Sequence, residues 1–271
     1  MKSGKLNNYS LQTDRARKRA CRDKLKVGKG EQRKFLSARA GNFHLFPTVL
    51  ICVLAFMNLR ITEIFLSIQG ESSHAGRPCA FVRLTGCPMR CAWCDSEYTF
   101  TGGEKISFAD IFNKLEEFDC NLVEITGGDP LAQKNVYPFI AALCDKNYEV
   151  LIETGGFFST ENVDERAKII LDVKCPASGE SERNHWANLE RLSAEKDEIK
   201  FVIADLNDWE YAKEIITKYD LETRAGEILI SPVFGIENLK EIAEQIARSN
   251  LKVRLNLQLH KYIWGANVHG V

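Results

Sequence analysis

The stretch GCPMRCAWCD, residues 86–95, places three cysteines at the spacing C-x3-C-x2-C. It directly follows the apolar run CAFVRLTG (79–86), which has the composition of a buried strand. Because Cys87, Cys91 and Cys94 lie on one short loop, their thiolates can converge on one centre. A loop that offers three thiolates and no neighbouring fourth indicates a metal centre with an open coordination position.

The chemistry of three thiolates separates the possible centres. A structural zinc ion takes four protein ligands, so Cys79 or Cys120 would have to supply the fourth from elsewhere. A disulfide would leave one thiol of the loop unused. Three thiolates on a cubane [4Fe–4S] cluster bind three irons and leave the fourth iron free for an exogenous ligand. The spacing therefore favours a cluster, with zinc and a disulfide as weaker alternatives.

Beyond the cysteine loop, strand-like and helix-like stretches alternate. Apolar, β-rich runs occupy 79–86, 121–128, 148–156, 167–176, 198–205, 227–235 and 251–260. Amphipathic stretches occupy 107–118, 136–147, 207–220 and 236–249, with Ser107 and Asn207 as candidate N-caps. This alternation predicts an α/β fold whose parallel strands are joined by right-handed crossovers. We expect an incomplete TIM-like barrel with outer helices and with chemistry at the carboxyl ends of its strands.

The composition is that of a folded, enzyme-sized domain. The chain has 271 residues, of which 45% are hydrophobic. Its nine cysteines are odd in number and unevenly placed, so they form no regular disulfide framework. They indicate a reducing compartment, the cytoplasm.

Charge divides the chain into two regions, 1–56 and 57–271. Residues 1–43 carry 13 Lys and Arg against 3 Asp and Glu, a net charge of +10, which leaves −11 for the remainder. The basic segment has no persistent period, which predicts a disordered arm able to touch nucleic acid or anionic lipid. The apolar run 44–56 contains Pro47 and is shorter than the roughly 18–20 residues of a spanning helix. We favour Met57 as the real start, with residues 1–56 a mis-called upstream reading frame. A genuine tail and a targeting segment that resembles a signal peptide are the alternatives.

Two motifs together resemble the radical S-adenosylmethionine (SAM) superfamily. The cysteine spacing, with Trp93 before the last cysteine, is similar to its signature, and TGGDP (126–130) is similar to its GGEP motif. On its own, TGGDP would also suit a Gly-Gly turn before a helix that starts with Pro. The resemblance implies a [4Fe–4S] cluster whose free iron binds SAM and whose electron cleaves it to a 5′-deoxyadenosyl radical. Gly127, Gly128 and Asp129 would then hold the methionine amino group, with Asp129 one methylene shorter than the usual Glu.

Further segments are similar to one family within that superfamily, 7-carboxy-7-deazaguanine synthase. They are SIQGES (67–72), FVRLTGC (81–87), CDSEYTF (94–100) and QLHKYIWG (258–265). The resemblance implies conversion of 6-carboxy-5,6,7,8-tetrahydropterin to 7-carboxy-7-deazaguanine with loss of ammonia, in queuosine and deazapurine biosynthesis. The reaction would start with hydrogen abstraction from C6 of the pterin and would regenerate SAM. The resemblance also implies Mg²⁺, a flavodoxin- or ferredoxin-type electron donor and a homodimer, without a nucleic-acid or membrane partner.

The resemblance assigns roles to residues of this chain in three groups. The metal ligands would be Cys87, Cys91 and Cys94 for the cluster and Ser96 for Mg²⁺. The pterin would contact Ile68, Gln69, Gly70, Glu71, Arg83, Thr126 and His260. SAM would contact Trp93, Cys94, Asp95, Gly127, Gly128, Asp129, Glu153, Thr154, Asp172, Val173, Lys174 and Asp205.

Some of these positions depart from the family pattern. Asp172 and Val173 stand where the family has Ser and Pro, so Lys174 alone is kept of that motif, and Gly155 stands in place of an Asn. Taken singly, Arg83 could instead pair with a buried acid, and His260, at the expected end of a strand, could be purely structural. The tail WGANVHGV (264–271) continues beyond the point where some family members end.

Two other classes of protein share part of these features. An activase of a glycyl-radical enzyme would carry the cysteine loop and a similar glycine motif, but has no need of SIQGES or QLHK. A zinc-stabilised nucleic-acid-binding protein would suit the basic arm and the cysteines. The charge of −11 over residues 44–271 argues against it, because a phosphate-binding face needs positive charge.

Overall fold

The computed structural model describes residues 57–271. The chain divides into two units after Ala55, and everything below concerns the second. The predicted basic arm, the apolar run 44–56 and the interpretation of Met57 as the start all involve residues outside the described range. Within that range, none of the helices combines the length and the apolar character needed to cross a membrane.

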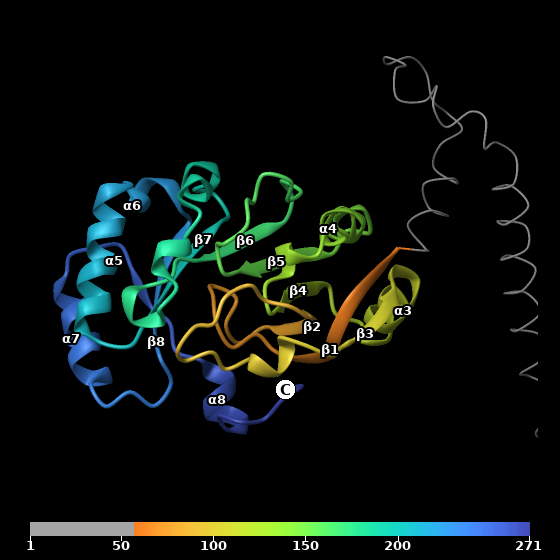
Figure 1. Cartoon of the computed structure of the whole chain (residues 1–271), viewed down its shortest axis with the longest axis horizontal. Helices are drawn as coiled ribbons and strands as arrows, with labels where there is room; N and C mark the ends of the chain where they lie inside the picture. The colour runs from red at the N-terminus through yellow and green to blue at the C-terminus, as the bar shows by residue number, and fades with distance from the viewer. Residues whose placement is uncertain (1–56) are drawn as a thin grey trace, which may run out of the picture. The chain divides into compact units, whose positions relative to one another are not determined.

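A parallel sheet forms the body of the unit, as the alternating pattern predicts (Figure 1). Its strands run β2-β4-β5-β6-β7-β8-β9 in space, which is also their order along the chain, and each pairs with the next in parallel. The bounds are β2 (Pro78–Leu84), β4 (Leu122–Gly127), β5 (Glu149–Thr154), β6 (Lys168–Asp172), β7 (Glu198–Ile203), β8 (Glu227–Pro232) and β9 (Arg254–Leu255). β3 (Glu104–Ser107) and β9 end the sheet at opposite edges, so the barrel stays open, as predicted.

Two strands that the sequence pattern did not indicate extend the sheet beyond the β2 edge. β1 (Asn58–Ile68) pairs antiparallel with β2, and β3 (Glu104–Ser107) pairs antiparallel with β1. Their residues mix apolar and charged side chains, because β1 is only partly buried and β3 lies at the edge. That composition lacks the continuous apolar run by which the buried parallel strands are recognised.

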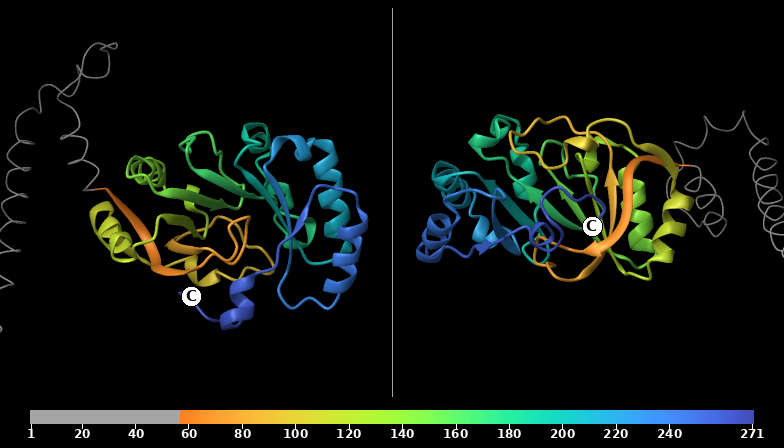
Figure 2. Two further views of the ribbon diagram at one scale, coloured as in Figure 1. Left: turned by 180° about the vertical axis from the view of Figure 1, so that it is seen from behind. Right: turned by 90° about the horizontal axis from the view of Figure 1, so that it is seen from below.

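Helices cover the outer face of the sheet (Figure 2). They are α3 (Phe108–Glu117), α4 (Val136–Asp145), α5 (Leu206–Lys218), α6 (Leu221–Arg224) and α7 (Leu239–Arg248). The Ser107 side chain caps α3 by accepting a hydrogen bond from Asp110 N–H, as predicted. The prediction of Asn207 as a cap is wrong: Asp205 caps α5 and accepts from Asp208 N–H, so this helix begins two residues earlier than expected.

The C-terminal part also differs from the prediction. The expected strand 251–260 is reduced to the two residues of β9, and the chain then turns into α8 (Leu259–Trp264). His260 therefore lies in a helix rather than at a strand end. Short 3-10 helices complete the connections: η2 (Glu97–Thr99), η3 (Pro130–Ala132), η4 (Pro176–Ser178), η5 (Ser181–Arg183) and η6 (Trp186–Arg191).

Candidate functional site

A cavity of about 410 Å³ opens at the carboxyl ends of the parallel strands. It brings together most of the residues that the sequence singled out, from both halves of the chain. On its wall lie Ile68, Gln69, Gly70, Glu71, Arg83, Cys87, Cys91, Trp93, Cys94, Asp95, Ser96, Thr126, Gly127, Gly128, Glu153, Thr154, Asp172, Lys174 and His260. Asp129 follows Gly128 in the chain and is buried rather than on the wall. Val173 and Asp205 are not on the wall: Val173 is buried and Asp205 caps α5.

The cysteine loop forms one side of the cavity. Cys87, Cys91 and Cys94 are all unpaired and partly buried, and burial raises the pKa of Cys87 and Cys91. No three Cys, His, Asp or Glu side chains among residues 57–271 converge on a single metal position. A cubane cluster does not require that convergence, because each thiolate binds a different iron. Three thiols on the wall of one cavity are therefore a donor set that fits such a cluster.

The glycines of TGGDP pack against the start of the cysteine loop. A Cβ on Gly127 would lie 2.2 Å from the carbonyl oxygen of Leu84, and one on Gly128 would lie 2.2 Å from that of Gly86. The backbone is hydrogen-bonded across the same contact, with Gly128 N–H donating to Leu84 O and Asp129 N–H donating to Gly86 O. Two glycines are therefore needed for β4 to approach the loop this closely.

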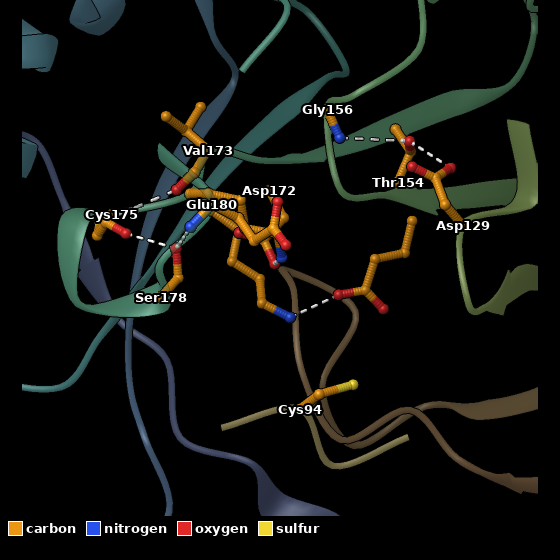
Figure 3. A network of polar contacts seen from close by, with 12 residues as sticks. Cys94, Asp129, Thr154, Gly156, Asp172, Val173, Cys175, Ser178 and Glu180 are labelled. Atoms are coloured by element: carbon orange, nitrogen blue, oxygen red, sulfur yellow. Dashed lines mark hydrogen bonds and ion pairs between the residues drawn. The ribbon is translucent and has the colours of Figure 1, made fainter. Parts of the chain in front are cut away.

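Gly127 and Gly128 are called the glycine cradle below. Asp129, the next residue, carries a carboxylate oxygen without a hydrogen-bond partner. Its Oδ1 accepts a hydrogen bond from the Thr154 hydroxyl at 2.9 Å (Figure 3). The same oxygen accepts from Leu131 N–H at 3.1 Å, whereas the buried Oδ2 has no partner. Burial raises the pKa of this carboxyl to about 6. An orphaned buried carboxylate oxygen costs free energy unless a ligand supplies a donor. This position suits an ammonium group, such as the amino group of a bound methionine moiety.

A second buried carboxylate faces the cavity from the end of β6. Asp172 Oδ2 accepts from Lys174 Nζ at 2.7 Å, and Asp172 Oδ1 has no partner. Lys174 is partly buried. Burial lowers its pKa, but Asp172 and nearby Cys91 raise it more, so its pKa lies above the usual range. Lys174 therefore keeps its positive charge next to the cysteine loop.

Lys200, on β7, was not identified from the sequence and joins two of the predicted site residues. Its Nζ lies 2.5 Å from Glu71 Oε2 and 2.5 Å from Glu153 Oε1. Burial opposes its charge, but the two carboxylates raise its pKa well above the usual value, and Lys200 in turn lowers the pKa of Glu71 against the effect of burial. A lysine inside the apolar run EIKFVIAD was the available signal, because a buried lysine requires a partner.

Glu124, in the middle of β4, is a further unpredicted group of the cavity. It is buried and accepts a hydrogen bond from the Gln69 side chain. Burial and then the nearby Glu153 raise its pKa to about 8, so it is protonated at neutral pH. The wall beneath the glycine cradle thus offers a neutral acid next to the Lys200 ion pairs.

Arg83 pairs with an acid, as the alternative interpretation of this residue proposed. Its Nε donates to Glu63 Oε1 at 2.7 Å, and the Tyr98 hydroxyl donates to the same oxygen at 2.9 Å. The guanidinium also lies over the Phe65 ring, 5.5 Å from its centroid. Arg83 lines the cavity, and because the pairing uses Nε, its two terminal nitrogens can still bind a carboxylate.

The segment around α8 forms a further part of the cavity wall. Gln258 Nε2 donates to Glu71 at 3.1 Å and to Asp95 at 3.0 Å, and Lys261 Nζ lies 2.6 Å from Asp95 Oδ2. Burial raises the pKa of Asp95, but Lys261 outweighs it and holds the pKa at about 2. The His260 ring packs against Gly70, where a Cβ would lie 2.2 Å from its Nδ1. His260 therefore lies on the cavity wall although it is not in a strand.

Ser96 lies at the end of the cysteine loop. Its Oγ is 3.7 Å from Cys94 Sγ, and both residues are on the cavity wall. One hydroxyl is a suitable but incomplete ligand set for Mg²⁺, which takes the rest of its oxygens from substrate and water.

Comparison with known proteins agrees with this geometry. Residues 81–177 match the radical SAM superfamily. The chain is 44% identical to the 7-carboxy-7-deazaguanine synthase of Koribacter versatilis over 227 residues, which cover 79% of this chain and 100% of that protein. It is also 44% identical to the protein of the same name from Chlorobaculum tepidum over 215 residues, covering 79% and 97% of the two chains.

The fold has a solved counterpart in the crystal structure of QueE from Escherichia coli. The TM-score is 0.64 at 25% identity, and the match covers 78% of this chain and 98% of that one. The same family name thus follows from full-length relatives and agrees with a cysteine loop, a glycine cradle and an unpartnered carboxylate on one cavity. The chain belongs to the 7-carboxy-7-deazaguanine synthase family of the radical SAM superfamily.

Proposed function

We propose that this protein converts 6-carboxy-5,6,7,8-tetrahydropterin to 7-carboxy-7-deazaguanine with loss of ammonia, within queuosine and deazapurine biosynthesis. The observation that carries the proposal is the 44% identity with a full-length synthase, which spans the whole cavity-bearing part of the chain. The activase alternative finds less support, because the SIQGES and QLHK segments lie on the wall of the same cavity and hydrogen-bond to each other.

Membership of the superfamily implies a [4Fe–4S] cluster and SAM. Cys87, Cys91 and Cys94 would hold the cluster, and together the two groups supply a 5′-deoxyadenosyl radical when bound. Asp129 Oδ2 would accept from the methionine amino group over the Gly127–Gly128 cradle. The remaining SAM contacts are proposed for Trp93, Asp95, Glu153, Thr154, Asp172 and Lys174 on the cavity wall, and for Val173 and Asp205 outside it.

The pterin would lie between the glycine cradle and α8. Glu71, held by Lys200, and the main chain of Ile68 and Gly70 offer hydrogen-bonding groups to the amide and amino edge of the ring. Arg83 would bind the carboxylate through its terminal nitrogens. Gln69, Thr126 and His260 complete the proposed contacts. The task of these residues is to orient the ring and to exclude water from the reacting carbon.

Three further elements belong to the proposal. Ser96 would ligate Mg²⁺ together with the substrate carboxylate, which would place a positive charge on that carboxylate. A flavodoxin- or ferredoxin-type protein would deliver the electron. A homodimer in the cytoplasm is the expected state of the protein.

The test is an anaerobic assay of the full chain after reconstitution with iron and sulfide. We expect about four irons per chain, an EPR signal of the reduced protein that changes with SAM, and a deazaguanine product seen by mass spectrometry. Cys91→Ser should lose iron and product, whereas Cys144→Ser, a cysteine of α4, should retain both. SAM cleavage without the product would refute the substrate, and bound zinc without iron would refute the cofactor as well.

A further inference from the structure

The segment that follows β6 packs directly on the cysteine loop. Ala92 N–H donates to Ser178 O at 3.0 Å, and Arg90 N–H donates to Glu180 Oε1 at 2.5 Å. Ser178 belongs to η4, and Glu180 lies in the turn before η5. None of the sequence motifs included these residues.

Two arginines bind the main chain of the loop between its first and second cysteines. Arg90 donates to Cys87 O at 2.9 Å and to Met89 O at 2.6 Å, and its guanidinium lies 4.1 Å from the Phe100 ring centroid. Arg183 donates to Pro88 O at 2.8 Å and lies 4.5 Å from the Phe157 ring centroid. Both guanidiniums are thus held by a carbonyl on one side and by an aromatic face on the other.

Glu180 connects these arginines and is itself fixed. Its Oε2 accepts from Arg183 at 2.9 Å, and the residue is 7% exposed. Its main-chain N–H donates to Ser178 Oγ at 3.1 Å, and that hydroxyl donates to Cys175 O at 2.5 Å (Figure 3). A buried carboxylate tied to both arginine residues at the outer side of the loop is a specific arrangement, because an unpaired buried charge would be costly.

We propose that Glu180, Arg183 and Arg90 are positioning residues that fix the cysteine loop and whose charges set the reduction potential of the cluster held by that loop. The proposal deepens the proposed function, since it rests on the same cluster. It concerns how readily the protein accepts its electron rather than how it binds the pterin.

The physical reason is electrostatic and has a definite sign. One-electron reduction, with an external donor such as dithionite as the reductant, adds one negative charge to the cluster and breaks no bond. A positive charge nearby favours the reduced form and raises the potential, and a negative charge lowers it. The two guanidiniums outweigh the Glu180 carboxylate by one charge. Arg183 is 38% exposed in its side chain, so solvent screens part of its effect.

Two substitutions that change the local charge in opposite directions distinguish the electrostatic role from a purely structural one. Arg183→Met removes a positive charge, and Glu180→Gln removes a negative charge while its amide oxygen can still accept from Arg90 N–H. We expect a lower midpoint potential for Arg183→Met and a higher one for Glu180→Gln, in EPR-monitored redox titrations of the reconstituted full chain. Arg183→Lys, which keeps the charge, should stay near the wild-type potential.

Retention of iron tests the positioning role. Loss of an outer-shell partner commonly reduces metal affinity by about 10- to 100-fold, so Arg183→Met and Glu180→Gln should both lose iron faster than the wild type to a chelator. Arg248→Met removes an exposed arginine of α7, whose side chain is 78% exposed, and should change neither quantity. Equal iron retention in all variants would overturn the positioning role.

The outcomes also separate this proposal from the proposed function. Potentials that shift in the same direction for Arg183→Met and Glu180→Gln, or not at all, would overturn the electrostatic role even if the wild type forms the deazaguanine. Opposite shifts without a deazaguanine product would support the electrostatic role of Glu180 and Arg183 and refute the proposed substrate. A wild-type chain that takes up no iron would overturn both.

Discussion

The Lys200 ammonium lies 2.5 Å from the Glu71 carboxylate, across a sequence separation of 129 residues. It thereby ties β7 to the loop between β1 and β2, on the wall of the cavity. The same ammonium also binds Glu153. One buried lysine therefore holds a residue proposed for the pterin and a residue proposed for SAM in a fixed relation.

Lys200→Met should destabilise the protein and abolish product formation. The substitution leaves two carboxylates next to each other without their cation, and breaking a buried ion pair from one side typically costs about 3–5 kcal/mol. Urea denaturation and the deazaguanine assay are the two measurements. Lys240→Met, at an exposed lysine of α7, is the matched control and should leave both unchanged. An unchanged free energy of unfolding in Lys200→Met would contradict the buried network.

Glu124→Gln should alter how stability depends on pH. The folded pKa of about 8 lies above the ordinary value of 4.5, so between these pH values the native state holds a proton that the unfolded state releases. The free energy of unfolding of the wild type should therefore fall relative to the variant as pH rises from 5 to 8, by up to about 1.4 kcal/mol per pH unit. Urea titrations of both proteins across this range measure the difference. A difference that stays constant with pH would show that Glu124 is ionised throughout.

Gly127→Ala should destabilise the protein more than a positive φ alone explains, because the main chain of Gly127 closely approaches that of Leu84. Gly127 has φ +130° and Gly102 has φ +81°, but a Cβ would meet Leu84 O at 2.2 Å in the first case and nothing within 4 Å in the second. Gly127→Ala should therefore cost about 1–3 kcal/mol more than Gly102→Ala, the usual penalty of overpacking. Thermal or urea unfolding of the two variants decides the point, and equal losses would contradict it.

Asp129→Asn should weaken SAM binding while stabilising the protein without SAM. The unpartnered Oδ2 costs free energy when ionised, and the raised pKa of about 6 means that this cost develops as pH rises from about 4 to 6. At pH 8 the variant should thus unfold at a higher urea concentration. Its affinity for SAM should drop by roughly 10-fold or more, since a charge-assisted hydrogen bond contributes about 1.5–3 kcal/mol. Calorimetric titration with SAM measures the affinity.

Asp129→Glu is the control for this position. It restores the side chain usual in the superfamily and keeps the negative charge, so it should bind SAM, unlike Asp129→Asn. Equal SAM affinity in all three proteins would mean that Oδ2 does not contact the ligand.

Features that depend on neighbouring residues alone could be predicted from the sequence. The spacing of Cys87, Cys91 and Cys94 placed the three thiols on one loop, and the apolar runs predicted the parallel strands, because both are local patterns that survive in any fold containing them. Ser107 was predicted as a cap for the same reason. The pattern was less informative where burial is partial, as in β1 and β3. It was also less informative where a strand is followed within a few residues by a helix, as before His260.

Which distant polar groups meet depends on the tertiary structure alone. Lys200 with Glu71, Glu124 with Gln69 and Glu180 with Arg90 are separated by 129, 55 and 90 residues. These contacts depend on the curvature of the open sheet and on the loops at the carboxyl ends of its strands, which carry distant segments to one cavity. Burial there acts on the pKa of Lys200, Glu71 and Glu124, and burial is a property of the whole packing that no short stretch of sequence contains.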